Sequence, residues 1–287
     1  MLKSQITITI ILAGIFFSCA QQHEEPDNTK TRILGHRGSG KGLASGYQEN
    51  TASSVKNAFD KLHGAEVDIQ CSKDSTIWLF HDGNLPENEQ GLLCIPSCRD
   101  AELEEFAKKD TAFTLSRLEE VFRLMVERKP TPFISLDIKG AFSEECFQEN
   151  NAPDHYFDMI AQRLSSLLKH YELWDHVLVE TNYTYFLDKI KITEPQIECY
   201  LLGFEDFRKN METVLKKSYD GLSYNFHDKE LTKKDIEAAK RKGLKIQLWS
   251  LYEQNDLQKA LSWKPDFIQT GRVNISPAYL SERKAYH

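Results

Sequence analysis

The sequence predicts an α/β protein, a (β/α)8 TIM barrel that forms a single domain. Two observations support this prediction. Short apolar runs with strand character alternate with amphipathic segments of helical period, and eight such runs follow one another from Thr31 onward. The composition does not break between Thr31 and His287, and a chain of 287 residues is long enough for one large hydrophobic core.

The barrel strands are expected where apolar runs are bounded by turn residues, at 31–34, 65–69, 133–138, 176–181, 196–202, 221–224, 244–250 and 266–270. A further short apolar run covers 77–80, and the region from there to Asp110 is polar and irregular. Helical periods predict helices at 50–62, 114–128, 154–170, 207–217, 232–241 and 253–261. Ser116 and Glu119 have the spacing of a capping box near the start of the second of these helices.

The charge of the chain argues against a nucleic-acid-binding protein. The sequence contains 43 acidic and 36 basic residues, which give a formal net charge of −7. Nucleic-acid-binding domains usually carry a basic patch instead. The charged and apolar fractions are ordinary for a soluble globular protein. We therefore expect no nucleic-acid partner.

Residues 1–19 are predicted to be an export signal and not part of the fold. The start is positively charged, and the apolar stretch at 6–17 is too short to span a bilayer comfortably. Two interpretations stay open. The segment resembles a bacterial lipoprotein signal in which Cys19 becomes the lipidated first residue, or it is an ordinary secretory signal cut near Ala20. Both place the mature protein in the cell envelope, with 20–30 as a polar tether.

An exported protein can form disulfides, because its compartment is oxidising. Cys94 and Cys98 bracket a small loop, so a disulfide between them and a pair of free thiols are both open. Five cysteines remain after Cys19, and an odd number leaves at least one thiol free. No second pair has the spacing of zinc ligands, so a zinc site is not favoured.

Polar residues that could take part in catalysis are concentrated between Gly35 and Asp82. His36 and Arg37 follow the first apolar run, and His81 closes the run at 77–80. In parallel α/β folds, the carboxyl ends of the strands are where catalytic residues gather. These side chains are therefore expected to meet at one end of the barrel.

Two pairs of charged residues lie on expected strands. Glu66 and Asp68 are two positions apart, as are Asp137 and Lys139, so each pair shares one face of its strand. Neighbouring buried carboxylates repel each other and need a cation, a proton or a polar cavity. A hard divalent ion such as Mg2+ or Ca2+ is the natural partner for oxygen ligands.

Four motifs together resemble the glycerophosphodiester phosphodiesterase family. They are HRG at 36–38, ENT at 49–51, Glu-x-Asp at 66–68 and HD at 81–82, in matching order and spacing. The resemblance continues to Thr270 and implies that residues 31–287 form a metal-dependent catalytic domain. The implied reaction is hydrolysis of a glycerophosphodiester to glycerol 3-phosphate and an alcohol.

The sequence departs from the family pattern at three positions. Gln48 stands where the family usually has proline before the ENT motif. Asp137 stands where the family commonly has glutamate, which shortens the side chain but keeps a carboxylate. Thr270 is followed by Gly271 where the family often has aspartate.

The resemblance also implies roles for individual residues. Glu66, Asp68 and Asp137 would hold one divalent cation, either Ca2+ or Mg2+, that acts as a Lewis acid on a phosphate oxygen. Arg37 and Lys139 would bind the phosphate. The histidines, His36 and His81, would form the acid–base pair, and which of them donates the proton stays open, as does whether water or a glycerol hydroxyl attacks.

Two further residues have weaker assignments. Glu49 is interpreted as an orienting or structural acid near a helix N-terminus, with direct ligation as the alternative. Trp249 ends an expected strand, where the family often has an aromatic residue that contacts the glycerol side of the substrate. Core packing is the competing interpretation for Trp249.

Two alternative functions remain. The first is a lipid phosphodiesterase of the same barrel class, phospholipase D-like, which would need an apolar rim at the pocket mouth. The segment from Gly91 to Ile95 is the nearby candidate for that rim. The second is a catalytically inactive envelope-binding lipoprotein, but a pure binding protein has no need for two acid–base groups.

Overall fold

A computed structural model of the chain describes residues 31–41, 45–86, 93–109, 113–140, 146 and 153–275. The expected signal segment, the tether and the lipidation of Cys19 all fall outside this described part. Within it, no helix combines the length and the apolar character that crossing a membrane would require.

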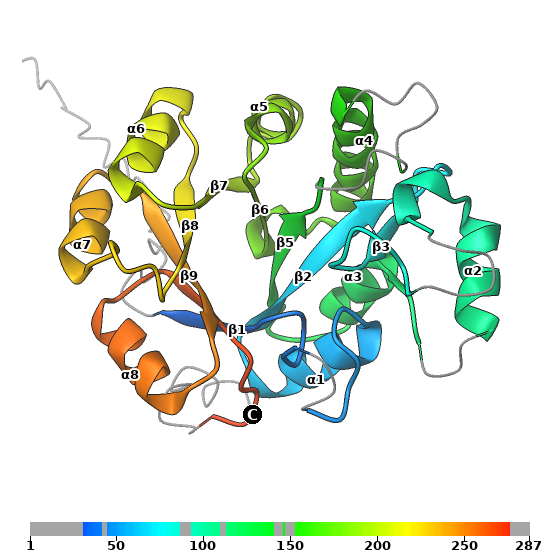
Figure 1. Ribbon diagram of the computed structural model, residues 1–287, viewed down its shortest axis with the longest axis horizontal. Coiled ribbons are helices and arrows are strands. Elements are labelled where there is room, and N and C mark those ends of the chain that lie inside the picture. Colours follow the sequence, from blue (N-terminus) through cyan, green and yellow to red (C-terminus); the bar gives the residue numbers. More distant parts are fainter. Residues whose placement is uncertain are drawn as a thin grey trace, which may run out of the picture.

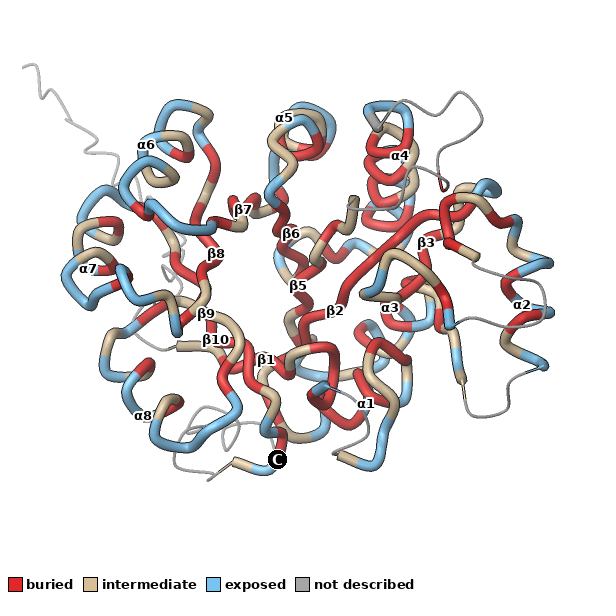
Figure 2. The backbone as a smooth tube through the Cα atoms, in the orientation of Figure 1, coloured by how far each residue is buried: buried red, intermediate tan, exposed pale blue. Residues whose placement is uncertain are grey.

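The predicted barrel is confirmed, with eight parallel strands in one closed ring (Figure 1). The strands are β1 (Arg32–Gly35), β2 (Gly64–Cys71), β5 (Phe133–Ile138), β6 (Val177–Thr181), β7 (Glu198–Gly203), β8 (Gly221–Asn225), β9 (Lys245–Leu251) and β10 (Phe267–Thr270). Their neighbour order is β1-β10-β9-β8-β7-β6-β5-β2, and the pairing of β1 with β2 closes the ring. The strands are mostly buried, as Figure 2 shows.

Helices surround the ring of strands and bury their apolar faces against it. They are α1 (Ala52–Lys61), α3 (Leu118–Val126), α4 (Pro153–Tyr171), α5 (Thr184–Thr193), α6 (Phe207–Lys217), α7 (Lys233–Arg241) and α8 (Gln254–Ser262), with a short 3-10 turn, η3 (Trp174–His176), before β6. Helix α5 was not predicted, because its sequence TYFLDKIKIT is rich in aromatic and β-branched residues that favour strands. Burial of Phe186, Leu187 and Ile190 stabilises the helix instead.

An insertion between β2 and α3 extends the barrel on one side. It contains β3 (Ile77–Leu79), the 3-10 turn η1 (Ile95–Ser97), α2 (Asp100–Lys109) and β4 (Ser116–Arg117). Strand β2 continues beyond the barrel, and β3 pairs with it in an antiparallel ladder. The insertion has its own small core, formed by Trp78, Leu85, Ile95, Cys98, Leu103 and Phe106.

Two predictions in this insertion were wrong. The region expected to be irregular contains helix α2, whose apolar face is only Leu103 and Phe106, so it lacks a strong helical period. The helix expected from 114 begins at Leu118, because the preceding residues form β4. Ser116 does not cap it, since its hydroxyl accepts a hydrogen bond from the Ala52 N–H at 2.9 Å.

The disulfide that was considered between Cys94 and Cys98 does not form. Cys94 is bonded to Cys146, with 5.9 Å between their Cα atoms. Turn η1 lies between Cys94 and Cys98, and the Cys98 side chain packs into the core of the insertion. The bond therefore ties the insertion to the segment after β5. Among the described residues, Cys71, Cys98 and Cys199 are free and buried.

Candidate active site

The structure brings the predicted charged residues together at the carboxyl ends of three neighbouring strands. His36 and Arg37 follow β1, Glu66 and Asp68 lie on β2, and Asp137 lies on β5. Strand β2 pairs with both β1 and β5, and the register places Asp68 directly beside Asp137. Side chains that are distant in the sequence therefore lie close together, because the strands that carry them are neighbours in the barrel.

Three carboxylates form a compact cluster. Glu66, Asp68 and Asp137 each offer an oxygen atom, and these atoms lie within 4.8 Å of one another. Glu66 and Asp68 are both 2 % exposed. Burial, followed by the charges of Asp68, Glu180 and Asp137, raises the pKa of Glu66 well above its usual range. The cluster therefore has an excess of negative charge that a divalent cation would stabilise, and its oxygen donors suit a hard ion.

Lys139 bridges two of these carboxylates. Its ammonium nitrogen lies 2.8 Å from Oδ1 of Asp68 and 2.6 Å from Oδ2 of Asp137. Burial alone would lower the pKa of Lys139, but the two carboxylates raise it above its usual value. Burial would likewise raise the pKa of Asp68, and the neighbouring positive charges, first Lys139, hold it below its usual range. Lys139 is therefore a fixed positive charge beside the cluster.

Arg37 is held by its backbone as well as by its side chain. Its φ of 52° lies in the left-handed region, and its N–H donates to Oε2 of Glu66 at 2.8 Å. The guanidinium donates to Oε1 of Glu49 at 2.7 Å, and its Nε lies 3.5 Å from Oδ2 of Asp68. Glu49 thus holds the Arg37 guanidinium and is not one of the three clustered carboxylates, and its orienting role stays a prediction.

Asn50, the middle residue of the ENT motif, is a site residue that the sequence reasoning missed. Its amide nitrogen donates to Oδ2 of Asp68 at 2.7 Å, and its amide oxygen accepts from the Asp68 N–H at 3.0 Å. This two-point contact fixes the carboxylate. Next to it, Thr51 caps helix α1 by accepting from the Ser54 N–H. Asn50 could be read in the ENT motif, but the motif does not reveal that its side chain contacts Asp68.

The two histidines differ in their surroundings. Burial lowers the pKa of His36 to about 3, and its Nε2 lies 3.9 Å from Oε2 of Glu66. His81 is more open, with 34 % of its side chain exposed, and its Nδ1 lies 2.7 Å from Oδ1 of Asp82. His81 lies close enough to Asp68 and Asp137 to be one of the lesser electrostatic influences on the pKa of each carboxylate.

Comparison with known proteins gives the family. Residues 36–275 match the Glycerophosphoryl diester phosphodiesterase family. The chain belongs to this family. It is therefore an enzyme, a phosphodiesterase.

Two curated relatives named glycerophosphodiester phosphodiesterase support the assignment. The protein from Caldanaerobacter subterraneus subsp. tengcongensis is 23 % identical over 243 residues, and that from Bacillus altitudinis is 23 % identical over 255 residues. Each alignment covers 84 % of this chain and 94 % of the relative. The similarity therefore extends over nearly the whole length of both proteins.

Solved structures show the same fold. A glycerophosphodiester phosphodiesterase from Thermotoga maritima is 21 % identical with a TM-score of 0.64, covering 88 % of this chain and 98 % of that one. A phosphodiesterase from Oleispira antarctica, solved in complex with the product sn-glycerol-3-phosphate, is 16 % identical with a TM-score of 0.70. That alignment covers 88 % of this chain and 97 % of the other.

One departure of this phosphodiesterase from the family pattern now has a structural reason. Gln48, which stands in place of the usual proline, makes two hydrogen bonds to the backbone of Thr114. Its amide nitrogen donates to the carbonyl oxygen at 2.8 Å, and its amide oxygen accepts from the N–H at 2.7 Å. The side chain fastens the ENT segment to the segment before β4, a contact that proline cannot make.

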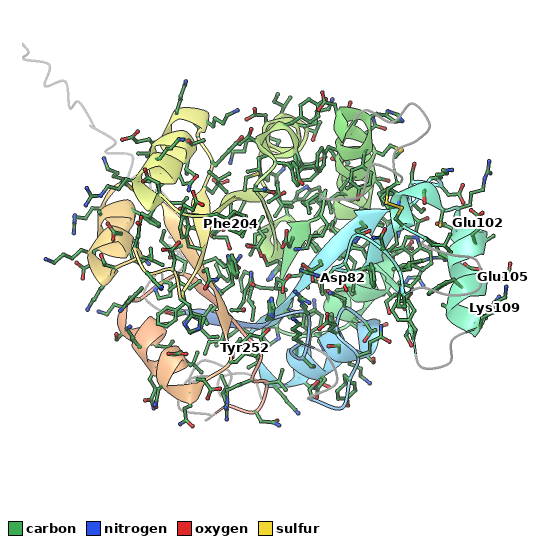
Figure 3. The ribbon with its side chains drawn as sticks, in the orientation of Figure 1. Asp82, Glu102, Glu105, Lys109, Phe204 and Tyr252 are labelled. Carbon is green, nitrogen blue, oxygen red and sulfur yellow. A yellow bond between two sulfur atoms is a disulfide. The ribbon has the colours of Figure 1, made fainter. Side chains whose placement is uncertain are left out.

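Trp249 lies between the core and the open end of the phosphodiesterase barrel. It is half-buried on β9, and its ring meets Phe204 edge-on with 6.1 Å between centroids. Phe204 is 54 % exposed, and Figure 3 shows it with Tyr252 and Asp82 on different sides of this end of the barrel. The predicted contact of Trp249 with substrate stays a prediction.

Glu180 is a second buried acid that the sequence reasoning missed. It lies on β6 beside Asp137 in the strand register, and its Oε1 accepts from Ser135 and Gln269. Burial, with a further contribution from Asp137, raises the pKa of Glu180 to about 7. A glutamate inside the apolar run VLVET was the available signal. Its raised pKa means that this buried acid, which is a neighbour of Asp137 in the strand register, holds a proton more readily than an exposed glutamate does.

Proposed function

We propose that this protein hydrolyses glycerophosphodiesters to glycerol 3-phosphate and an alcohol, using one divalent cation and two histidines. The observation that carries the proposal is the cluster of Glu66, Asp68 and Asp137, whose oxygens lie within 4.8 Å of one another. His36 borders this cluster directly. The matching family and the glycerol 3-phosphate bound to the Oleispira antarctica relative support the substrate class.

The carboxylates are the residues that would hold the cation. Bound there, it would polarise a phosphate oxygen and offset negative charge that develops in the transition state. Glu66 is kept in place by the Arg37 N–H, and Asp68 is kept in place by Asn50. These contacts orient the oxygen donors before a ligand arrives, which limits the reorganisation needed on binding.

The cationic side chains would bind the phosphodiester itself. The Arg37 guanidinium is planar and suited to two parallel contacts with phosphate oxygens, while the Lys139 ammonium is a compact charge. Both already face the carboxylate cluster, at Asp68. A phosphate bound beside the cluster would therefore meet positive charge on more than one side.

The histidines would move the protons. One imidazole accepts a proton from the attacking oxygen as its bond to phosphorus forms, and the other donates a proton to the leaving alkoxide oxygen as its P–O bond breaks. If the attacking group is a glycerol hydroxyl, the product of this step is a cyclic phosphate, and water must open it in a second step to give glycerol 3-phosphate. His36 suits the accepting role, because its lowered pKa keeps it neutral near pH 7. Asp82 would orient His81 through its Nδ1, which leaves Nε2 for the leaving group.

The described residues of the proposed apolar rim do not favour the lipid alternative, and Gly91 and Leu92 of that rim lie outside the described part of the chain. In the described part of the proposed apolar rim, Ile95 is fully buried and Leu93 packs on the core of the insertion. Ile95 therefore offers no surface to a lipid, and Leu93 is only partly exposed. The inactive binding-protein alternative is also not favoured, because His36 and Lys139 lie beside the carboxylate cluster, and a pure binding protein has no need for an acid–base group there.

Product analysis tests this proposal. The protein is expected to release glycerol 3-phosphate from glycerophosphocholine and glycerophosphoethanolamine when Mg2+ or Ca2+ is supplied. A coupled glycerol 3-phosphate assay measures the release, and a lysophospholipid serves as the comparison substrate. Cleavage of the lysophospholipid alone would contradict the proposal and support the lipid alternative. No cleavage of any of these diesters by folded, metal-loaded protein would contradict both.

A further inference from the structure

Tyr252 lies against His36 although 216 residues separate them in the chain. It follows β9, and its hydroxyl oxygen is 2.8 Å from Nδ1 of His36. The two rings meet edge-on, with 5.9 Å between centroids and 87° between planes. This contact occupies the Nδ1 edge of the imidazole and leaves Nε2 turned toward Glu66, 3.9 Å from its Oε2.

Gly271 provides the space for the Tyr252 ring. A Cβ atom at position 271 would lie 2.2 Å from Cε1 and 2.3 Å from Cδ1 of Tyr252, which is far too close for unbonded atoms. The Gly271 N–H donates to the Leu251 carbonyl at 2.9 Å, so the end of β10 holds the segment that carries the tyrosine. Arg272 donates to the Tyr252 carbonyl at 3.3 Å. The absence of a side chain at 271, one of the three sequence departures, is thus linked to Tyr252.

We propose that Tyr252 is a positioning residue for the reaction proposed above, on which this inference rests. Its hydroxyl group fixes the orientation of the His36 ring and biases the choice between its two neutral tautomers. In a neutral imidazole one ring nitrogen carries a hydrogen and donates, and the other has a lone pair and accepts. A hydrogen-bond partner at one nitrogen therefore determines whether the other nitrogen is the donor or the acceptor. Gly271 is the position that permits the contact, because any larger residue displaces the ring.

The test replaces the hydroxyl group and keeps the ring. In Tyr252→Phe, kcat is expected to fall about 10- to 100-fold with little change in KM, as for other residues that orient a reacting group. The 15N signals of the His36 imidazole, which report the tautomer ratio and the bond at Nδ1, are expected to shift. Tyr185→Phe is the matched control, because Tyr185 is similarly exposed and its hydroxyl bonds Asp158 on an outer helix.

Three results would overturn the inference. An unchanged kcat would show that the hydroxyl group is dispensable. A higher KM at unchanged kcat would make Tyr252 a substrate contact instead. A lower kcat with unchanged imidazole signals would show that Tyr252 does not act through His36. The NMR measurement needs no substrate, so it still decides the link between the two residues if the wild-type protein releases no glycerol 3-phosphate and the proposed function fails.

Gly271→Ala gives an independent check of the same arrangement. The added methyl group is expected to push the Tyr252 ring aside and lower kcat as Tyr252→Phe does. In a Tyr252→Ala background, where no ring is present to displace, the same substitution is expected to cost little further activity. Equal losses in both backgrounds would mean that Gly271 acts without Tyr252.

Discussion

His36→Ala is expected to lower kcat for glycerophosphodiester hydrolysis by about 10²- to 10⁴-fold, the range typical of a lost acid–base group. The reason is geometric as well as chemical. His36 borders the carboxylate cluster through Nε2 and is neutral near pH 7, so no neighbouring group in the described structure duplicates its role. Steady-state release of glycerol 3-phosphate measures the effect.

A matched variant separates catalysis from folding in this experiment. His170→Ala removes an exposed histidine on helix α4 and is expected to keep full activity. Thermal unfolding of both variants should resemble that of the wild-type protein. His36→Ala removes the hydrogen-bond partner of the Tyr252 hydroxyl group, but Tyr252 is exposed enough for water to replace it, and His170 is exposed. A His36→Ala protein with nearly full kcat would remove His36 from the mechanism.

Asp68→Asn is expected to have the second large effect, a loss of divalent-cation binding of about 10- to 100-fold or more in affinity. The substitution keeps the size of the side chain but removes a negative charge that faces Lys139, Arg37 and the other carboxylates. Asn50 and Lys139 contact different oxygens of Asp68, and an amide replaces one of these oxygens by an NH2 group, which cannot accept a hydrogen bond. Calorimetric titration with Mg2+ or Ca2+ measures the affinity.

Asp60→Asn is the control for that experiment. Asp60 lies on the outer side of helix α1, where it pairs with Arg128 at 3.0 Å, and 55 % of its side chain is exposed. Its substitution is expected to leave both cation affinity and activity unchanged. Wild-type cation affinity in Asp68→Asn would place the cation elsewhere and would contradict the assignment of the carboxylate cluster.

Local sequence patterns were sufficient to predict the barrel, because alternating apolar runs and helical periods record which faces are buried. The hydrophobic pattern did not predict helices that bury few apolar side chains, or helices whose residues favour strands. Helix α2 buries only Leu103 and Phe106, and α5 has the composition of a strand. The Cys94–Cys146 disulfide joins residues 52 positions apart and depends on how the insertion packs, which spacing cannot reveal.

The candidate site was predictable to the extent that its residues stand in compact motifs. His36 and Arg37 directly follow β1, Lys139 directly follows β5, and Asp137 is the last residue but one of β5, whereas Glu66 and Asp68 lie inside β2, which continues beyond the barrel. Asn50, Glu180 and Tyr252 were missed for a different reason. Their partners are supplied by other strands and loops, so nothing next to them in the sequence marks the contact.

The most direct test of the central claim is a metal titration of the EDTA-treated protein, in which bound cation and glycerol 3-phosphate release are measured together. We expect the metal-free protein to be folded but inactive on glycerophosphocholine. Activity should return in proportion to bound Mg2+ or Ca2+ and reach its maximum at one cation per chain. Full hydrolysis by metal-free protein, or an activity that rises without cation binding at the carboxylate cluster, would contradict it.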